Sequence, residues 1–472
     1  MSEDSALIED FLGVPNRSFA SSDLANLSDL QSNTYNNQLS YDFLSATSDL
    51  IDVHEGFLEI VVAVTGGAAF ASASPLVAFK GAVTALFRGI TILLDGQTIH
   101  TEYESEFGTV LNTLLTSATW KEGCKDQLFS GKDYAPSVVV SGLNTAAGLT
   151  SPKTNYFSAA PLATANNISN TFNQGFVERN ISVLNNAIAT QAPPTTAGFS
   201  ATAYIPLVYL SDFFKKCGLI TNCRYQVQFA LNTAHAAPTY PPMAAGTLAN
   251  GTVETAPIVN ITSSRLWYRR VKLDPECTVI FEERLRSGGF DRDIRFIERN
   301  FYTNFTNVSG TNTFTHLLDS AVIAPQRIWV WTVPTGQLTT TTWPSHCATG
   351  AYGIQKVQVT VANTPYFPTT YDDQIMLWDA FKDEVMPVMD GEDNGCQINW
   401  NDWVNTHRIY CFNISRVKDQ QRDPNQPVNI VLSGSLTGTG TAVDFIYVIE
   451  KAKKVNVKFG SGRVQVTQGA PF

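Results

Sequence analysis

Apolar and polar residues alternate in short runs along most of the chain after residue 48, which is the pattern of half-buried β-strands. The runs at 50–64 and 224–231 show this alternation most clearly. A third run ends at Asp95-Gly96, a dipeptide typical of tight hairpin turns. The pattern therefore predicts an all-β chain. The expected strands are 57–65, 76–86, 86–94, 201–210, 224–231, 264–273, 278–281, 295–303, 327–333, 428–432, 442–450 and 455–459.

One long segment, 102–117, has the spacing of an amphipathic helix, with apolar residues at intervals of three and four. Those residues are Tyr103, Phe107, Val110, Leu111, Leu114 and Leu115. A single helical turn is expected at 211–216. The segment 123–199 is dominated by Gly, Pro, Ser, Thr and Asn, which predicts long loops between short strands.

The chain contains a weak internal repeat. Residues 88–97 and 327–337 each consist of an arginine, an alternating apolar strand, a turn with Gly, and then Gln. Residues 204–231 and 407–432 each present a strand, a short polar interruption and a second alternating strand. The repeat predicts two similar β-domains in tandem, each with enough strands for an eight-stranded sandwich.

Length and composition agree with this organisation. A chain of 472 residues exceeds one ordinary domain, and 44% hydrophobic residues are sufficient for a packed core. The Ala-, Pro- and Gly-rich stretch after residue 232 has the composition of a linker. The predicted parts are an N-terminal acidic arm (1–47), a first β-domain (48–232), a linker (233–262) and a second β-domain with a basic tail (263–472).

Charge is distributed unevenly along the chain. The formal net charge is -10, and residues 1–53 hold nine acidic residues against the single Arg17. Proteins that wrap nucleic acid directly use basic arms, because Lys and Arg neutralise phosphate. The acidic arm therefore argues against sequence-specific nucleic-acid binding. The basic run near the C-terminus is either a solvated strand face or a weak phosphate-facing patch. It comprises Lys451, Lys453, Lys454, Lys458 and Arg463.

The cysteines do not predict a disulfide framework, because their number is odd and none forms a CxxC pair. They are Cys124, Cys217, Cys223, Cys277, Cys347, Cys396 and Cys411. Cys217 and Cys223 are the only near neighbours, and buried apolar thiols explain them better than a zinc site. The sequence leaves open whether these two or any other cysteines pair. Reduced thiols and an acidic N-terminus without a signal peptide predict synthesis in the cytoplasm.

The twenty residues 60–79 carry no charge until Lys80, and twenty residues are enough to span a bilayer. Gly66-Gly67 and Pro75 lie inside this stretch, which argues against a membrane helix. Two strands joined by a loop of small residues explain the same composition. Contact with a membrane surface stays undecided at this stage.

Motifs for chemistry are incomplete. His54-Glu55 begins a metalloprotease pattern, but Leu58 stands where the second histidine is required. The acidic turn 390–395 resembles the start of a calcium loop and lacks its closing Glu. Gly131-Lys132 and Ser461 lack the spacing of a P-loop and of a nucleophile elbow. The sequence predicts no catalytic, cofactor-binding or metal-binding residue, no cofactor and no enzymatic activity. Six scattered histidines are expected to be loop or core residues: His54, His100, His235, His316, His346 and His407.

Three segments carry a resemblance to a known family. They are the opening strand 48–60, the strand–turn–helix 86–115 with Asp95-Gly96-Gln97, and the segment 204–214, followed by a linker and a more divergent second half. Residues 48–472 thereby resemble the major capsid proteins of the double jelly-roll family, found in small eukaryotic double-stranded DNA viruses such as polinton-like viruses and virophages. The sequence lacks the aromatic signatures of the second roll in the larger giant-virus capsid proteins.

The resemblance implies two consecutive eight-stranded antiparallel jelly rolls with few short helices. It also implies homotrimers in which six rolls form a pseudo-hexagonal capsomer, and capsomers that tile an icosahedral shell around double-stranded DNA. The implied partners are the chain itself, neighbouring capsomers, and penton and minor capsid or cement proteins. The implied location is the virion.

Other interpretations stay open at this stage. A carbohydrate-binding or carbohydrate-processing double β-sandwich would use Trp343, Trp400 and Trp403 as a platform, and a minor vertex or spike protein would share the virion. The mixed-sign run 282–299 is either a contact between subunits or a solvated salt-bridge face. The acidic arm is expected to face inward and to bind basic minor proteins or a lattice neighbour.

Overall fold

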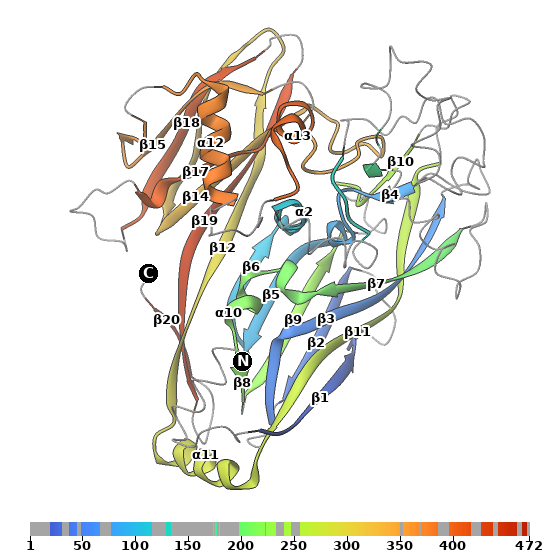
Figure 1. Ribbon diagram of the computed structural model, residues 1–472, viewed down its shortest axis with the longest axis vertical. Helices are drawn as coiled ribbons and strands as arrows, with labels where there is room; N and C mark the ends of the chain where they lie inside the picture. Colours follow the sequence, from blue (N-terminus) through green and yellow to red (C-terminus); the bar gives the residue numbers. More distant parts are fainter. Residues whose placement is uncertain are drawn as a thin grey trace.

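The computed structural model describes most of the chain. The described residues are 19–30, 37–44, 49–66, 77–115, 129–133, 173, 175–176, 179, 198–221, 223–232, 240–246, 255–349, 353–367, 370–385, 396–416, 426–437, 442–459 and 465–469. Over these residues the chain forms two β-sandwiches that lie side by side (Figure 1).

The first sandwich consists of two antiparallel sheets. One has the strand order β1-β11-β3-β7, with β8 also paired to β3. Its strands are β1 (Phe19–Ser28), β11 (Pro257–Leu273), β3 (Asp49–Gly66), β7 (Phe199–Pro206) and β8 (Leu219–Ile220). The other sheet has the order β2-β9-β5-β6. Its strands are β2 (Gln38–Leu44), β9 (Arg224–Leu231), β5 (Phe87–Leu94) and β6 (Gln97–Tyr103).

The second sandwich repeats this plan. One sheet has the order β12-β19-β14-β17, with β20 paired to β19, and the other has the order β13-β18-β15-β16. The first comprises β12 (Phe290–Asn307), β19 (Val443–Phe459), β14 (Pro325–Pro334), β17 (Tyr410–Asn413) and β20 (Gln465–Gly469). The second comprises β13 (Thr313–Val322), β18 (Val428–Leu436), β15 (Ile354–Val361) and β16 (Thr364–Pro365). A separate two-stranded sheet joins β4 (Val77–Phe79) and β10 (Met243–Ala245).

Short helices connect and flank the strands. The α-helices are α2 (Ser105–Leu115), α10 (Asp212–Lys216), α11 (Pro275–Ser287), α12 (Gln374–Val385) and α13 (Trp400–Asn405). The 3₁₀ helices are η1 (Val83–Leu86), η2 (Leu207–Tyr209) and η4 (Ile414–Arg416). None of these described helices is long and apolar enough to cross a membrane.

Alternation along the strands builds the core of each sandwich. In β9, Tyr225, Val227, Phe229 and Leu231 are buried, and the residues between them face outward or are partly exposed. Each sandwich has its own apolar core. The lower halves of β12 and β19 belong to the first core, and Figure 1 shows these two long strands running past both sandwiches. One continuous pair of strands therefore holds the two sandwiches together.

The predicted strands match the structure best where apolar and polar residues alternate within one short segment. Strand β9 has the predicted bounds, the predicted helix 102–117 is α2, and the turn 211–216 is α10. Residues 207–209 form η2 instead of extending the strand 201–210. The expected strands 442–450 and 455–459 are one strand, β19.

The predicted strand 278–281 is wrong, because these residues lie in helix α11. Asp274 caps the helix by accepting a hydrogen bond from the Glu276 amide, and Pro275 occupies the first turn, where its missing N–H costs nothing. The helix buries Cys277, Phe281 and Leu285 at intervals of four. Packing of this stripe outweighs the β-propensity of the Thr-Val-Ile run.

Two predicted domain boundaries also differ from the boundaries that the strand pairing gives. Residues 19–28 and 38–44, expected in the acidic arm, form β1 and β2 and pair with β11 and β9 of the same chain. Strand β11, whose first residues were expected in the linker 233–262, pairs with β3. The change from the first to the second sandwich therefore occurs at α11.

The second internal repeat corresponds to equivalent positions in the fold. Residues 204–231 run from the end of β7 to β9, and residues 407–432 run from β17 into β18; β7 and β17 are last in their sheet orders, and β9 and β18 are second in theirs. The first repeat has no such correspondence, because β5 and β14 lie in non-equivalent sheets.

Candidate functional site

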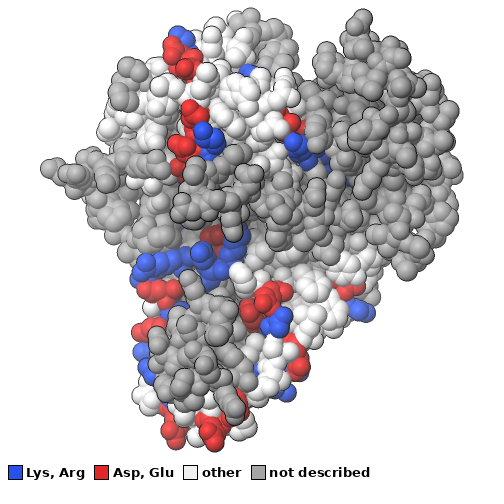
Figure 2. Space-filling model, viewed as in Figure 1, with Lys and Arg blue, Asp and Glu red and all other residues white. Residues whose placement is uncertain are grey.

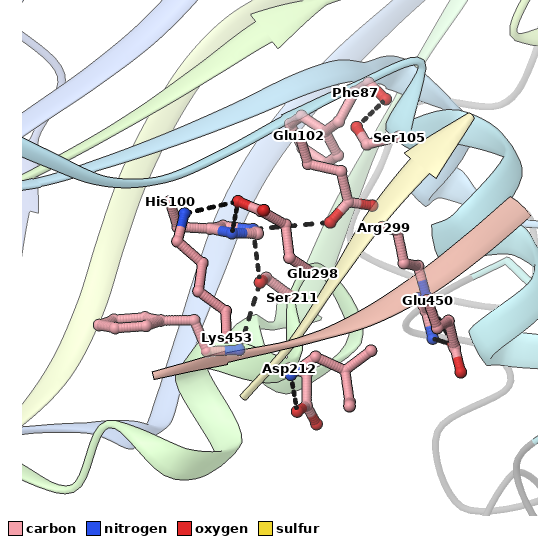
Figure 3. A network of polar contacts seen from close by, with 12 residues as sticks. Phe87, His100, Glu102, Ser105, Ser211, Asp212, Glu298, Arg299, Glu450 and Lys453 are labelled. Carbon is pink, nitrogen blue, oxygen red and sulfur yellow. Dashed lines mark hydrogen bonds and ion pairs between the residues drawn. The ribbon is translucent and has the colours of Figure 1, made fainter. Parts of the chain in front are cut away.

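A buried network of charged groups joins the two sandwiches (Figure 3). Its centre is His100 on β6, which is fully buried. Nε2 of His100 lies 3.0 Å from the Ser211 hydroxyl oxygen and 3.5 Å from Oε2 of Glu102. On the other side, Nδ1 lies 3.6 Å from Oε1 of Glu298 on β12. The imidazole thus lies between a carboxylate of the first sandwich and a carboxylate of the second.

The two carboxylates determine the charge of His100. Burial alone would lower the pKa of the imidazole, because the charged form loses its hydration. Interactions with Glu102 and Glu298 outweigh this effect and raise the pKa of His100 above its usual value. The ring also packs edge-on against Phe296, with 5.4 Å between ring centroids. The geometry therefore favours a protonated, doubly paired imidazolium in the folded protein.

Glu298 is shared by three cationic groups. Lys453 and Lys451 on β19 place their Nζ atoms 2.7 and 3.0 Å from its two carboxylate oxygens. Burial would raise the pKa of Glu298, but His100, Lys453 and Lys451 hold that pKa far below its usual range. The carboxylate stays ionised and links β6, β12 and β19.

A second buried carboxylate, Glu450, continues the network along β19. Nη2 of Arg299 on β12 lies 2.9 Å from its Oε1, and Nε of Arg327 on β14 lies 3.1 Å from its Oε2. Glu450 is only 3% exposed, and burial would raise its pKa, yet the two guanidinium groups lower it. Three adjacent strands are thereby tied by charged side chains as well as by backbone hydrogen bonds.

Backbone contacts complete this inter-sandwich network. The carboxylate of Asp212, on α10, accepts a hydrogen bond of 2.9 Å from the Ile297 amide. The guanidinium of Arg292 donates to the carbonyl oxygen of Leu219, at 2.9 Å. The network therefore fixes β12 and β19 against α10 and β8 of the first sandwich.

A second set of buried contacts joins residues from the two halves of the chain. Lys80, fully buried, donates hydrogen bonds to the carbonyl oxygens of Leu338 and Thr340, at 2.9 and 2.6 Å. Arg179 forms a buried ion pair of 2.8 Å with Asp133 and donates a hydrogen bond of 3.1 Å to the carbonyl oxygen of Pro344 in the second half. Burial lowers the pKa of Lys80 to about 7, because the charged form loses its hydration and no carboxylate of the described residues compensates it.

His407 is part of this second set as a neutral residue. Its Nδ1 lies 3.0 Å from the Cys347 carbonyl oxygen, and its Nε2 accepts from the Asp133 amide at 3.1 Å. These contacts define the tautomer with the proton on Nδ1. Burial lowers the pKa of His407, so it stays uncharged and serves as a structural link.

The described histidines and cysteines do not assemble a site for chemistry. Three histidines, His100, His346 and His407, are buried in different surroundings. His54 is exposed and His316 is half-buried. Within the described ranges, no group of three His, Cys, Asp or Glu residues is placed to hold a metal ion. The side chains of Cys217 and Cys223 are buried, and Cys124 lies outside the described residues. His235, Ser461 and the turn 390–395 also lie outside them.

The predicted tryptophan platform does not form. Trp343 is 7% exposed and Trp403 is fully buried, so neither offers a ring to a ligand. Trp400 is 42% exposed and stacks on Trp403 with 5.6 Å between centroids. The carbohydrate interpretation therefore loses the surface on which it depended.

The predicted charged runs form pairs within the chain. In the run 282–299, Arg286 pairs with Glu282, and Asp293 pairs with Lys454 at 2.6 Å. Figure 2 shows Lys and Arg side chains gathered near mid-height of the visible face, with acidic side chains directly beside them. In the described part of the basic run, Lys451 and Lys453 contact Glu298 and Lys454 contacts Asp293, so these three lysines form ion pairs on the strand face, while Lys458 is exposed. Arg463 lies outside the described residues.

Sequence reasoning missed the inter-sandwich network, although one signal was present. In β6, His100 and Glu102 occupy the buried positions of an alternating strand, where apolar residues are usual. Ionisable residues at such positions indicate a paired, buried network. Their partner Glu298 belongs to a distant segment, so no local spacing identifies it.

Comparison with known proteins identifies the fold. No protein-family model matches the chain, and no curated protein matches it in sequence. Among solved structures, a chain of the Sputnik virophage is similar, with a TM-score of 0.67 and 11% identity over 97% of this chain and 90% of that chain. The mavirus major capsid protein is similar with a TM-score of 0.52 and 11% identity, over 94% of this chain and 90% of that one.

At 11% identity, the likeness to these two structures shows the fold alone. The chain has the double jelly-roll fold, which confirms the predicted fold class. The resemblance to double jelly-roll capsid proteins is confirmed in the same structural sense.

Proposed function

We propose that this chain is the major capsid protein of a virus with an icosahedral shell around double-stranded DNA. Three copies form a pseudo-hexagonal capsomer from six jelly rolls, and capsomers tile the shell. The observation that carries the proposal is the fold likeness to the mavirus major capsid protein and to a Sputnik virophage chain, which extends over nearly all of this chain.

The internal geometry supports this role. A shell unit has to keep its two rolls in a constant relation, because neighbouring units contact both. The inter-sandwich network does this through charged groups that are almost all paired, including His100, Glu298 and Glu450. Buried ionic contacts of this kind favour one relative arrangement of the packed elements over others.

The proposal includes partners and location. The chain binds copies of itself first, then neighbouring capsomers, and at special positions penton and minor capsid or cement proteins. It is made in the host cell cytoplasm and resides in the virion. Its role is structural, without enzymatic activity or a cofactor. Lys451, Lys453 and Lys454 on β19 are engaged by Glu298 and Asp293, which supports the absence of sequence-specific nucleic-acid binding.

The purified chain tests the proposal directly. Light scattering combined with negative-stain electron microscopy should show hexagonal particles of about 155 kDa, three times the chain mass of 51.6 kDa. Two-lobed monomers at every protein and salt concentration would overturn it. A minor vertex or spike role, the remaining alternative, predicts a weak band for this chain in a stained gel of virions, whereas a shell protein dominates that gel.

A further inference from the structure

Helix α12 borders an acidic groove of about 440 Å³ on the second sandwich. Asp379, Asp383 and Glu384 contribute carboxylates to its lining. Its aromatic lining includes Tyr371 and Phe367, whose rings stack with 3.8 Å between centroids. We call this surface, made of these five residues, the acidic groove.

The charge of the acidic groove is only partly balanced by the described residues. Asp379 and Asp383 are four residues apart on one helix, so their like charges repel. Lys382 contacts Asp379 at 3.2 Å and Arg327 lies 3.8 Å from Glu384, whereas Asp383 is exposed and has no partner among the described residues. A carboxylate beside aromatic faces is the environment that binds a guanidinium or ammonium group.

A surface of the opposite charge lies on the first sandwich. Strand β11 exposes Arg265, Arg269 and Lys272. Arg269 pairs with Glu55, while Arg265 and Lys272 have no partner among the residues that the structure describes. We call the surface formed by these three residues and Trp267 the basic face.

The basic face also has the apolar groups of an interface. Trp267 stacks on Phe57 of β3 with 5.8 Å between centroids, and Phe57 packs against Tyr204 of β7, which is 40% exposed. Aromatic and arginine side chains together are the composition enriched at protein–protein contacts. The chain therefore carries two different surfaces that complement each other in charge and share an aromatic component.

The two surfaces cannot meet within one copy. In Figure 1, α12 lies at the upper left on the second sandwich, and β11 with β1 lies at the lower right on the first. Different complementary surfaces at opposite sides of a protomer produce head-to-tail contacts, which close into a ring when the rotation between successive copies returns to the first. We propose that the acidic groove of one copy receives the basic face of a second copy of this chain. This inference rests on the proposed self-assembly and specifies which surfaces make it.

Charge reversal with a matched control tests the inference. Sedimentation velocity over a concentration series, at about 0.15 M salt, compares the wild type with Asp383→Lys. Glu283→Lys makes the same charge change on an exposed residue of α11. A fourth chain carries Asp379→Lys and Asp383→Lys together with Arg265→Glu and Lys272→Glu, which exchanges the charges of these four residues between the two surfaces and leaves Glu384 and Arg269, each paired within the chain, unchanged. Thermal unfolding of each variant confirms that it folds.

We expect Asp383→Lys to weaken self-association by about ten-fold or more, Glu283→Lys to leave it unchanged, and the fourth chain to recover it. If the wild type associates and Asp383→Lys associates equally well, the inference is wrong and the proposed function stands. A folded fourth chain that stays dissociated would also overturn the pairing. A wild type that never associates would overturn the proposed function, and this inference with it.

Discussion

His100 and Glu298 face each other across the junction of the two sandwiches, with Nδ1 of the imidazole 3.6 Å from Oε1 of the carboxylate. One residue lies on β6 of the first sandwich and the other on β12 of the second. The pair therefore couples the protonation of one side chain to the packing of two domains.

This coupling predicts a pH-dependent contribution to stability. The groups that face His100 are Glu102, Glu298, Lys453 beyond Glu298, and Ser211. Burial lowers the pKa of His100, but the two carboxylates outweigh it and raise that pKa. Because the pKa of His100 is higher in the folded than in the unfolded protein, its stabilising contribution is fully present at pH values below the unfolded pKa of about 6.5. The contribution is lost as the pH rises through the folded value.

The neutral variant His100→Gln tests this prediction. Its melting temperature should fall furthest below that of the wild type in mildly acidic buffer, and the two should converge as the pH rises. Scans at pH values from about 5 to 9 measure the difference. A difference that is constant over this range would show that His100 contributes packing alone.

Glu298→Gln should be more damaging than most polar substitutions. It leaves His100, Lys451 and Lys453 without their shared carboxylate, and losing one partner of a buried ion pair costs about 3 kcal/mol. Denaturant unfolding measures the loss. Glu283→Gln, on an exposed face of α11, is the control and should change stability by less than about 0.5 kcal/mol. Equal effects of the two substitutions would contradict the role given to Glu298.

Lys80 should have the opposite pH dependence to His100. Burial lowers its pKa to about 7 from 10.5, so between these values the unfolded chain holds a proton that the folded chain has released. Stability from this group therefore rises with pH across the window. Lys80→Met removes the titration, so its melting temperature relative to the wild type should decline from about pH 7 to about pH 10. A difference between the two melting temperatures that does not change with pH would contradict the lowered pKa of Lys80.

Gly108 tests the packing between α2 and β12. A methyl group added at Gly108 would lie 2.7 Å from Cζ of Phe301, closer than any normal contact. Gly108→Ala should therefore destabilise the protein by about 1–3 kcal/mol through overpacking. Phe301→Leu should relieve the clash, so a double-mutant cycle should give a favourable coupling energy. If the effects of the two substitutions on the free energy of unfolding are additive, helix α2 and strand β12 can move apart without cost, and the proposed clash is wrong.

The sequence predicts the fold where structure depends on local pattern. The residues of β9 alternate strictly, and α2 has a clear apolar stripe, so both were identified. Strand β1 escapes sequence reasoning because half of its residues, FASSDLANLS, are polar without a clear alternation, most of those described are exposed, and the strand is held by backbone pairing with the distant β11. Helix α11 was read as a strand because the β-branched run concealed the cap at Asp274.

The inter-sandwich network depends on contacts that sequence spacing does not encode. His100 and Glu102 are neighbours on β6, yet their partners come from β12, β19 and the start of α10. Two ionisable residues at the buried positions of one strand are a local signal that buried charged or polar partners exist. Their identity follows only from the long β12–β19 pair, which brings distant charges to one side of the first sandwich.

Truncation of the acidic N-terminus should separate folding from assembly. Residues 39, 41 and 43 lie in β2 and are buried in the first core, so deletion of 1–47 removes part of that core. We expect the 1–47 deletion to unfold or precipitate. Deletion of residues 1–18, which precede β1 and lie outside the described residues, should leave the fold intact.

The shorter deletion then tests the proposed role of the acidic segment. Residues 1–18 contain Glu3, Asp4, Glu9 and Asp10 against Arg17, a composition suited to binding a basic neighbour in the shell. The 1–18 deletion should still form trimers by light scattering, because β1 and β2 remain. Under conditions in which the full chain builds closed shells, electron microscopy should show free capsomers instead. Normal shells would contradict an assembly role for this segment, and loss of the trimer would place its function within the capsomer.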